Sequence, residues 1–524
     1  MIATKRSPAQ AWGRPLEKFA AFSFEGGLNV KLSPQALATQ AKYRDHLTLA
    51  RHVVYSKSKG VTKRLDTATY NTSTIGASVA ITGVFELKRS NGDRFIIGGT
   101  DDGRLVLFNS GGTTTDLVTG LTTGRRWSFA TYNDLGICVN GVDAPRKTDG
   151  TVAGTTTLGG SPPTTASHVF THGNRVFMVT ANASTLTWSA LNNEEDYTTA
   201  NNAGSMVVAR NDGGNLIAGI SAISEALLLK ENNVYRLQGT NPSTFAVTNV
   251  VPARTSVGGI SFQALTFAAN DIWLGSRRGV HSVRTVQEFG DLQENFASEK
   301  IDPYFQANTD YTVSLNQLAI MAIAYDPQNN RLYVGVDTTN NAQNDTIFVL
   351  DVFTRGWSVW PTMSCASMGV ANNGTNGDEV FMGGYDGFLR RLNVNASTNA
   401  IDARFNYITD LGMPFKVKAV RQIYVYLSEE GNQNLTVTTN YDFGATGGQS
   451  YAVSMLGGSR TLGVNWTLGT DPLGARSQII KRLSVSGQGE FVEIGCSNGN
   501  AGQPFTVYGF EVLYRDRRTV GRGA

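Results

Sequence analysis

The chain has few of the cysteines that form disulfides in small secreted proteins, and it lacks the long apolar runs that span a membrane. Only three cysteines occur among 524 residues, Cys138, Cys365 and Cys496, and their odd number and wide spacing argue against a disulfide framework. No apolar run approaches the roughly 20 residues of a membrane span, and the N-terminal stretch lacks the unbroken apolar core of a signal peptide. We therefore expect a protein that folds in a reducing compartment, with its cysteines as small core residues.

An excess of charge of one sign is also lacking. The chain holds 45 Lys and Arg residues against 42 Asp and Glu residues, a formal net charge of +3, so no overall field marks a dedicated nucleic-acid binder or membrane-surface protein. Proline is scarce at 14 residues, whereas glycine reaches 57. Together with recurrent Thr, Asn, Val and aromatic residues, this mixture favours short strands joined by glycine and Asx turns. We predict an all-β fold.

One hairpin pattern recurs along the chain. In FIIGGTDDGRLVLFN, residues 95–109, two β-rich runs flank a polar turn whose Asp-Gly pair supplies the positive φ angles that a hairpin needs. Similar units recur at intervals of about 40 to 60 residues, the length of one four-stranded propeller blade. Seven units predict about seven blades, and they begin at Asp93, Asp134, Asn174, Glu225, Asp271, Asn330 and Asp378.

Burial explains why such a unit repeats. A single sheet cannot cover its own apolar faces, whereas blades stacked around an axis cover each other and expose only short outer edges. We assign residues 81–395 to a β-propeller. Residues 1–80 are expected to form an N-terminal arm and first strands, because they carry clustered basic residues and few apolar ones. Residues 396–524 alternate with period two, which predicts a C-terminal antiparallel β-sandwich or sheet with one wet face.

Signatures of catalysis are missing. The chain has no G-x-x-x-x-G-K phosphate loop, no H-E-x-x-H zinc helix and no G-x-S-x-G nucleophile elbow. His168 and His172 are four residues apart, but their surroundings are typical of a strand and no third ligand is in sight. We interpret them as surface or blade-interface histidines. The sequence predicts a protein that is not an enzyme, with no cofactor and no metal site.

Aspartates recur in the predicted turns, and two interpretations compete. They could gather at a propeller mouth as acid, base or calcium ligands, or they could act as turn residues that cap their own backbone. No fixed spacing brings two carboxylates together, so we favour the turn interpretation. The residues are Asp101, Asp102, Asp143, Asp337 and Asp386.

Arginine doublets also have two interpretations. They occur at residues 125–126, 277–278 and 390–391, and a basic stretch follows Tyr514. Each arginine can pair with a phosphate, but the doublets are scattered and balanced by acids. A solvated face or a subunit contact is therefore the preferred interpretation.

The N-terminal region resembles the signature of bacteriophage tail proteins. FEGGLNVKLSP is followed by LARHVVYSKSKGVTKRLDTATYN, and in that family a G-G-L-N stretch precedes an N-V segment ending in K-R-x-G. His52 stands where the family has Asn, and no glycine follows at Leu65 or Asp66. The stretches YDPQNNRLYVGV, TIFVLDVFTRGWSVW and GGYDGFLRRL and the closing GFEVLYR also resemble these proteins. The matching residues are Gly26, Gly27, Leu28, Asn29, Val53, Gly60, Lys63 and Arg64.

The resemblance implies a structural virion protein, the tail nozzle or hub of a short-tailed phage. Such a protein is made in the host cytoplasm and assembles in the virion tail as a ring, usually a hexamer, that extends the DNA ejection channel below portal and adaptor. Implied partners are further copies of the chain, the adaptor, tail fibres or needle, the host envelope, and double-stranded DNA that passes without sequence-specific binding. Candidates for assembly in the arm are Gly26, Gly27, Leu28, Asn29, Lys63 and Arg64.

Two other functions stay open. The Gly-Gly pairs in FIIGGTDDG and FMGGYDG are typical of kelch-like propellers, which would make the chain a sugar-binding module or an enzyme, although only two of seven units carry the pair. A receptor-binding tail protein is the other alternative, with aromatic residues such as Trp188 or Tyr197 stacking on sugars. For those aromatics, a loop or interface role is the competing interpretation.

Overall fold

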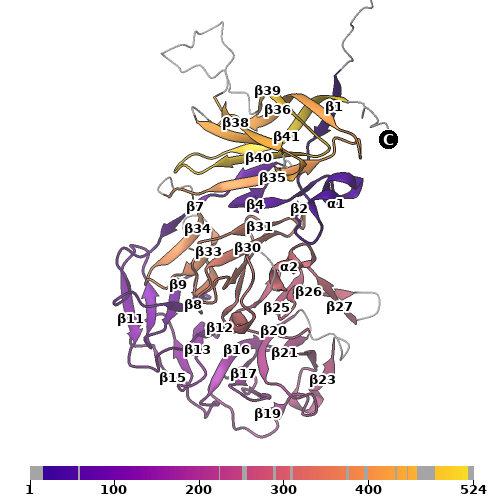
Figure 1. The fold of residues 1–524 in the computed structure, drawn as a ribbon. Helices are drawn as coiled ribbons and strands as arrows, with labels where there is room; N and C mark the ends of the chain where they lie inside the picture. The colour runs from indigo at the N-terminus through magenta and orange to yellow at the C-terminus, as the bar shows by residue number, and fades with distance from the viewer. Residues whose placement is uncertain are drawn as a thin grey trace, which may run out of the picture. The chain divides into compact units, whose positions relative to one another are not determined.

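The described residues form mainly β-strands (Figure 1). The computed structural model describes residues 16–516 apart from 57–59, 223–224, 251–256, 287–290, 307–310, 373, 375–376, 395–398, 431–432, 445 and 457–477. Helices in this part of the chain are short, namely α1 (Pro34–Thr39), α2 (Asp302–Phe305) and the 3-10 turns η1 (Ala41–Tyr43), η2 (Pro242–Thr244), η3 (Glu299–Ile301), η4 (Leu315–Ile320) and η5 (Asp442–Gly444). None of the described helices has the length and apolar character needed to cross a membrane.

The chain divides into two compact units. One comprises Leu28–Lys31 and Arg64–Ile401, and the other comprises Met1–Gly27, Leu32–Lys63 and Asp402–Ala524. The first unit is the propeller and the second is a β-sandwich. Because its two halves flank Arg64–Ile401, the sandwich is discontinuous in sequence and the propeller segment is an insertion within it.

The described residues of the propeller form seven four-stranded antiparallel blades. The first strands of successive blades lie side by side in a closed ring, in the order β8, β12, β16, β20, β24, β28, β32 and back to β8. The first four blades are β8 (Ile81–Lys88), β9 (Arg94–Thr100), β10 (Leu105–Phe108) and β11 (Thr114–Val118); β12 (Ser128–Tyr132), β13 (Leu135–Val139), β14 (Arg146–Thr148) and β15 (Thr156–Thr157); β16 (Ala166–His172), β17 (Arg175–Thr180), β18 (Thr185–Trp188) and β19 (Gly204–Val207); and β20 (Leu216–Ser221), β21 (Ala226–Lys230), β22 (Val234–Gln238) and β23 (Ala246–Asn249).

Two further blades follow the same order, and the seventh differs in its last strand. They are β24 (Leu265–Ala268), β25 (Asp271–Ser276), β26 (Gly279–Val286) and β27 (Asp291–Phe296); β28 (Ala322–Asp326), β29 (Arg331–Val336), β30 (Thr346–Asp351) and β31 (Trp357–Trp360); and β32 (Ser367–Asn372), β33 (Asp378–Gly383), β34 (Leu389–Val394) and β7 (Asp66–Thr69). The predicted all-β propeller is therefore confirmed. Each predicted repeat begins at, or one residue before, the second strand of a blade.

The ring is closed by a strand from the N-terminal side of the blades. β7 pairs antiparallel with β34, with Thr69 opposite Arg390 and Ala68 opposite Arg391. Apolar residues of blades seven and one, among them Phe381 and Ile81, then share one buried cluster. The predicted propeller, residues 81–395, omits β7, because nothing local in DTAT reveals a partner more than 300 residues away.

Close approach between blades one and two depends on a glycine. The Trp127 side chain is buried and packs beside the end of β9. A Cβ atom added to Gly99 would lie 2.2 Å from the Trp127 ring, well inside any van der Waals contact. The Gly-Gly pair in FIIGGTDDG therefore has a packing role at this blade interface.

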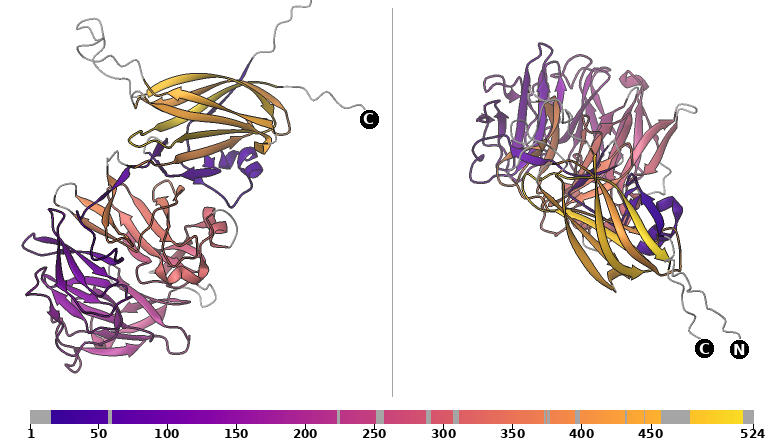
Figure 2. Two further views of the ribbon diagram at one scale, coloured as in Figure 1. Left: turned by 60° about the vertical axis from the view of Figure 1, so that its left-hand side comes forward. Right: turned by 90° about the horizontal axis from the view of Figure 1, so that it is seen from above.

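The second unit is a sandwich of two antiparallel sheets (Figure 2). Phe24, Phe405 and Phe510 meet between the sheets, with ring centroids 5.8 to 6.3 Å apart. One sheet contains β39 (Gln478–Gly489), β36 (Lys418–Ser428), β41 (Thr506–Asp516), β6 (Val61–Lys63) and β5 (Val53–Tyr55), with β1 (Glu17–Ala21) also paired to β41; the other contains β4 (Leu49–Arg51), β35 (Ala403–Thr409), β40 (Val492–Asn498), β37 (Asn434–Tyr441) and β38 (Thr446–Ser454). The short strands β2 (Gly27–Leu28) and β3 (His46–Leu47) complete the described elements.

Residues 16–63 do not form the expected arm, although the expected first strands are present. β1, β4, β5 and β6 are strands of the sandwich, drawn in indigo among the orange and yellow C-terminal strands in Figure 2. Val53, Val54 and Tyr55 are all buried, so this segment contributes core residues despite its few apolar positions. The predicted division at 80/81 and 395/396 thus differs from the observed units, which separate at Lys63/Arg64 and Ile401/Asp402.

Candidate functional site: the propeller axis and the N-terminal signature

One arginine links the segments that lead into the first strands of several blades. Arg126 precedes β12, and its Nη1 donates a hydrogen bond to the carbonyl of Ala319 at 3.1 Å, just before β28. Its Nη2 donates to the carbonyl of Ala366 at 3.1 Å, just before β32, and to Oε1 of Gln263. Four blades are thus held by a single side chain. Burial of the guanidinium lowers the pKa of Arg126 to about 10.

Gln263 extends this network to blade one. Its Nε2 donates to the carbonyl of Thr82 at 2.6 Å and to that of Trp127 at 3.2 Å. The backbone carbonyl of Gln263 accepts a hydrogen bond from the Ile323 amide at 2.8 Å. Because these partners lie in or just before the first strands of blades on different sides of the ring, the Arg126 and Gln263 side chains cross this end of the propeller axis. They close it by satisfying backbone carbonyls of four blades, those of Thr82, Trp127, Ala319 and Ala366.

A buried histidine links the inner strands of three blades. His168 on β16 lies 2.8 Å, through Nδ1, from the Ser128 hydroxyl on β12, and its Nε2 lies 2.8 Å from the carbonyl of Gly219 on β20. The carbonyl can only accept, so Nε2 carries the proton and Nδ1 accepts from Ser128. Burial lowers the pKa of His168 to about 4. The interpretation of His168 as a blade-interface histidine is confirmed.

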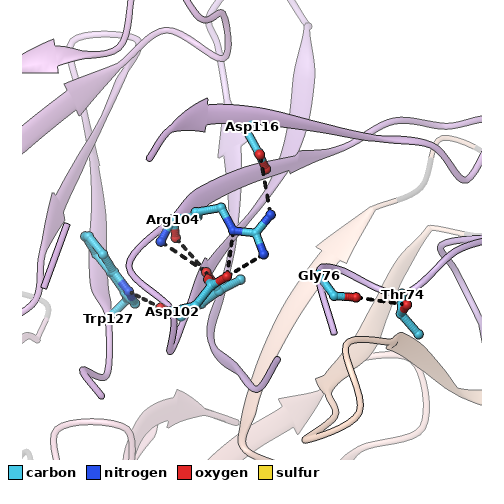
Figure 3. Close-up of polar contacts among 7 residues, drawn as sticks. Thr74, Gly76, Asp102, Arg104, Asp116 and Trp127 are labelled. Carbon is cyan, nitrogen blue, oxygen red and sulfur yellow. Dashed lines mark hydrogen bonds and ion pairs between the residues drawn. The ribbon is translucent and has the colours of Figure 1, made fainter. Parts of the chain in front are cut away.

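The turn after β9 shows how the predicted turn aspartates act (Figure 3). Asp102 accepts hydrogen bonds from Arg104, whose Nε lies 2.8 Å away, and from the Thr100 hydroxyl at 2.6 Å. The Thr100 carbonyl also accepts from the Trp127 indole at 3.2 Å. Burial opposes ionisation, but the hydrogen bonds from Arg104 and Thr100 hold the pKa of Asp102 below its ordinary value. The hairpin is therefore locked internally and joined to the next blade.

Two other predicted turn aspartates also accept hydrogen bonds from backbone amides. Asp143 accepts from the amide and hydroxyl of Thr122 at 2.8 and 2.9 Å, and Asp337 accepts from the amides of Thr339 and Asn340 at 2.9 and 2.6 Å. The turn interpretation is therefore confirmed for Asp337, whereas Asp143 bonds to a residue 21 positions earlier and joins two loops. Among the described residues, no group of three His, Cys, Asp or Glu side chains is placed to hold a metal ion.

The arginine doublets serve different purposes. Arg126 lies at the propeller axis, whereas the neighbouring Arg125 is exposed. Arg390 pairs with Asp386 and Arg391 pairs with Glu379 at 2.7 Å. At least three of these arginines thus have partners within the chain. Arg125 lies on a solvated face, as expected.

The first half of the phage-like signature is packed inside the chain. A Cβ atom at Gly26 would lie 2.4 Å from Nδ1 of His46. Gly27 has a φ of 64° and donates its amide to the Phe24 carbonyl at 3.1 Å, a turn that glycine adopts without strain. Leu28 and Asn29 are both buried, and Oδ1 of Asn29 accepts from the Lys31 amide at 3.2 Å.

The second half of the signature straddles the boundary between the two units. Lys63 belongs to the sandwich, where Nζ donates to Oδ1 of Asn498 at 3.2 Å and to the Asn500 carbonyl at 2.8 Å. Arg64 begins the propeller unit, and its guanidinium lies 5.1 Å from the Trp360 ring centroid. Burial lowers the pKa of Arg64 to about 10. All six assembly candidates thus have roles within the subunit, and they do not form one exposed patch. Their part in joining subunits stays a prediction.

Several side chains have roles that the sequence interpretation did not anticipate. Trp188 and Tyr197, considered for sugar stacking, are buried at 5% and 7% exposure, so the structure contradicts that part of the receptor-binding hypothesis and makes both core residues. The three cysteines are buried and unpaired, as expected. Arg126 and Gln263 at the axis were missed, and only the arginine doublet drew attention to one of them.

Comparisons with known proteins do not place the chain in a family. No family model matches it, and no curated protein matches it. Solved structures with partial similarity include YCF48 bound to D1 peptide, with 12% identity over 69% of this chain and 100% of that chain at a TM-score of 0.42. The extracellular domain of the hybrid two-component system BT4673 from B. thetaiotaomicron has 13% identity over 71% of this chain and 45% of that chain, also at 0.42. The computationally designed Ika8 protein has 12% identity over 66% and 96%, at 0.35.

Proposed function

We propose that the chain is a structural subunit of a phage tail, a nozzle or hub protein that forms a ring around the DNA ejection path. The observation that carries the proposal is the N-terminal signature, Gly26 to Asn29 followed by Lys63 and Arg64. These residues shape the turn after Phe24 and anchor the point where the sandwich continues into the propeller.

The closed propeller axis supports a route for DNA outside the propeller bore. Arg126 and Gln263 fill one end of the axis with side chains that are bonded to several blades. A propeller bore is in any case narrow compared with a DNA duplex. DNA would then pass along the axis of a ring of subunits, with each propeller as a rigid body in its wall. A formal net charge of +3 suits a conduit that must not hold its cargo.

Electron microscopy of the purified full chain, alone and with adaptor and portal, tests the proposal. Rings of a fixed subunit number, usually six in such a family, are the expected result. A chain that stays monomeric in every mixture would overturn it, and a clear glycan-array hit without rings would favour the sugar-binding alternative.

A truncation can separate assembly from folding. Removal of residues 16–63 would destroy the sandwich, because this segment supplies four of its strands. Removal of residues 1–15 spares every described strand and is the appropriate test of a joining segment. The truncated chain should keep its unfolding temperature, and rings that persist unchanged would exclude a joining role for residues 1–15.

A further inference from the structure

Among the described residues, Arg126 has no charged partner at the propeller axis. Its acceptors are the carbonyls of Ala319 and Ala366 and the side-chain oxygen of Gln263, all of which are neutral. By contrast, Arg391 on β34 forms an ion pair with a glutamate at 2.7 Å. An arginine that is largely enclosed by protein usually faces a carboxylate, because removal of a charge from water is costly unless an opposite charge compensates it.

The ionisable groups around Arg126 are neutral at pH 7. Those that act on the pKa of its guanidinium are the Tyr385 hydroxyl and the Cys365 thiol. Burial raises the pKa of both groups to about 12, so neither supplies a negative charge. Asp337 and Asp345 act on these two groups, but their carboxylates accept hydrogen bonds within the turn between β29 and β30. The positive charge of Arg126 is therefore uncompensated within the described part of the chain.

Hydrogen-bond donors also remain unused beside the axis. Three of the five guanidinium N–H groups of Arg126 have acceptors, whereas its Nε and the second N–H of Nη1 have none among the described residues. The Tyr385 hydroxyl accepts from the Asn344 amide at 3.1 Å, and no described acceptor takes its own proton. Tyr385 lies in the turn between β33 and β34. Blade seven thus adds a hydroxyl donor to the guanidinium that precedes blade two.

Solvent reaches one edge of the guanidinium. Arg126 is partly exposed, and the hydrogen bond from its Nη1 to the Ala319 carbonyl lies at the surface. The two bonds of Nη2, to Gln263 and Ala366, are more deeply buried. A ligand that approaches along the axis from outside would therefore meet Nη1, while the inner bonds hold the guanidinium plane in place. Such a preorganised donor loses little freedom on binding.

We propose that this end of the propeller axis binds a single carboxylate group, with Nη1 of Arg126 and the Tyr385 hydroxyl as its donors. One uncompensated positive charge matches one negative charge, and a planar guanidinium beside a hydroxyl suits the two oxygens of a carboxylate. A phosphate monoester carries a charge of about −1.5 to −2 at pH 7, more than Arg126 can balance, and the Asp337 carboxylate that acts on Tyr385 would repel it. The proposal goes beyond ring formation and does not depend on it.

The unfolding temperature of the full chain in sodium acetate and in sodium chloride, at matched ionic strength, tests the site. Acetate at about ten times its Kd should raise the unfolding temperature by about 2 °C relative to chloride, because only the folded chain brings the two donors together. Arg126→Gln should abolish this difference. Arg277→Ala is the matched control, since Arg277 is an exposed arginine of another doublet, and it should keep the difference. Equal responses of the two variants, or no difference in the native chain, would overturn the proposal.

Tyr385→Phe tests binding separately from the stability of Arg126 variants, because it keeps the guanidinium and the aromatic ring. Saturation-transfer NMR of the acetate methyl group measures the affinity at a temperature where circular dichroism shows each variant to be folded. Loss of one hydrogen bond to a charged ligand should lower the affinity about tenfold. An affinity equal to that of the native chain would overturn the proposed pair of donors.

Peptides distinguish two sources of the carboxylate. A peptide with blocked ends and one central aspartate is compared with its asparagine counterpart and with acetate. Tighter binding of the aspartate peptide than of acetate would support a side chain of a partner protein as the ligand, and equal binding would support a small free carboxylate. Equal binding of the aspartate and asparagine peptides, or tighter binding of inorganic phosphate than of acetate, would overturn the proposal.

Discussion

Oδ1 of Asn71 accepts a hydrogen bond from the Leu389 amide at 2.7 Å across 318 residues of sequence. The Nδ2 atom of the same side chain donates to the carbonyls of Gly387 and Ser73 at 2.9 and 2.7 Å. Asn71 is 1% exposed, so water cannot replace these bonds. One amide side chain thus fastens the strand that closes the propeller ring.

Replacing Asn71 by alanine should destabilise the propeller by about 3 kcal/mol, because one buried amide and two carbonyls lose their partners. Denaturant unfolding followed by tryptophan fluorescence measures the change. Asn91→Ala is the control, since Asn91 is an exposed turn residue whose side chain hydrogen-bonds to the nearby Asp93, and its effect should stay within about 0.5 kcal/mol. Equal midpoints for the two variants would contradict the role of Asn71.

Arg126→Ala should cost about 2 kcal/mol or more, because three acceptors near the propeller axis lose their donor. Arg126→Lys should recover only part of this, since one ammonium cannot reproduce the planar guanidinium fork. Thermal unfolding measures both variants. The adjacent Arg125→Ala, at an exposed position, should leave the unfolding temperature unchanged, and a loss equal to that of Arg126→Ala would disprove a specific axial role.

Stability should fall in mild acid because of His168. Its pKa is about 4 in the folded chain against an ordinary value of 6.5, so the unfolded chain binds the proton first. The contribution of neutral His168 is complete above pH 6.5 and is lost as the pH falls toward 4, by about 3 kcal/mol in all. Unfolding free energies between about pH 7.5 and pH 4.5 should show this slope, and His168→Gln should flatten it. An unchanged slope in the variant would assign the effect to other groups.

Gly99→Ala should destabilise the interface between the first two blades by about 2 kcal/mol or more, because its Cβ atom would overlap the Trp127 ring. Gly111→Ala provides the comparison, since a Cβ atom there meets nothing within 4 Å, and it should be neutral or slightly stabilising. Both variants can be compared by thermal unfolding. If Gly99→Ala were as stable as Gly111→Ala, the packing argument for the Gly-Gly pair would fail.

Much of the propeller could be predicted from the sequence because its signals are local. The second and third strands of each blade form a hairpin, and alternation together with turn residues such as Asp102 and Gly103 identifies a hairpin within about 15 residues. β7 escaped prediction because DTAT is short and its partner is distant. β4 was missed for the same reason, since it has three residues and its partner β35 is more than 300 residues away. β5 and β6 pair with each other across a short turn, so the strand-like stretches HVVYS and GVTKRL reveal them locally.

The candidate sites could be predicted only in part. Turn aspartates such as Asp337 satisfy neighbouring amides, so their role follows from the local sequence. The role of Arg126 depends on how the segments before the first strands of four blades come together in space. The local sequence of an arginine doublet at the propeller axis does not differ from that of a doublet on a solvated face. Trp188 was considered for ligand stacking because a strand-end aromatic can be either exposed or buried, and only the packing of the neighbouring blade decides which.

Pairing of β1 with β41 has a consequence for synthesis on the ribosome. Glu17 lies opposite Tyr514, so the first strand must wait for almost the whole chain to be translated before its partner exists. At about 5 to 20 residues per second this delay is roughly half a minute to two minutes. Throughout it the nascent N-terminus carries unpaired strands and uncovered apolar side chains, which makes it a binding target for chaperones while the blades fold behind it.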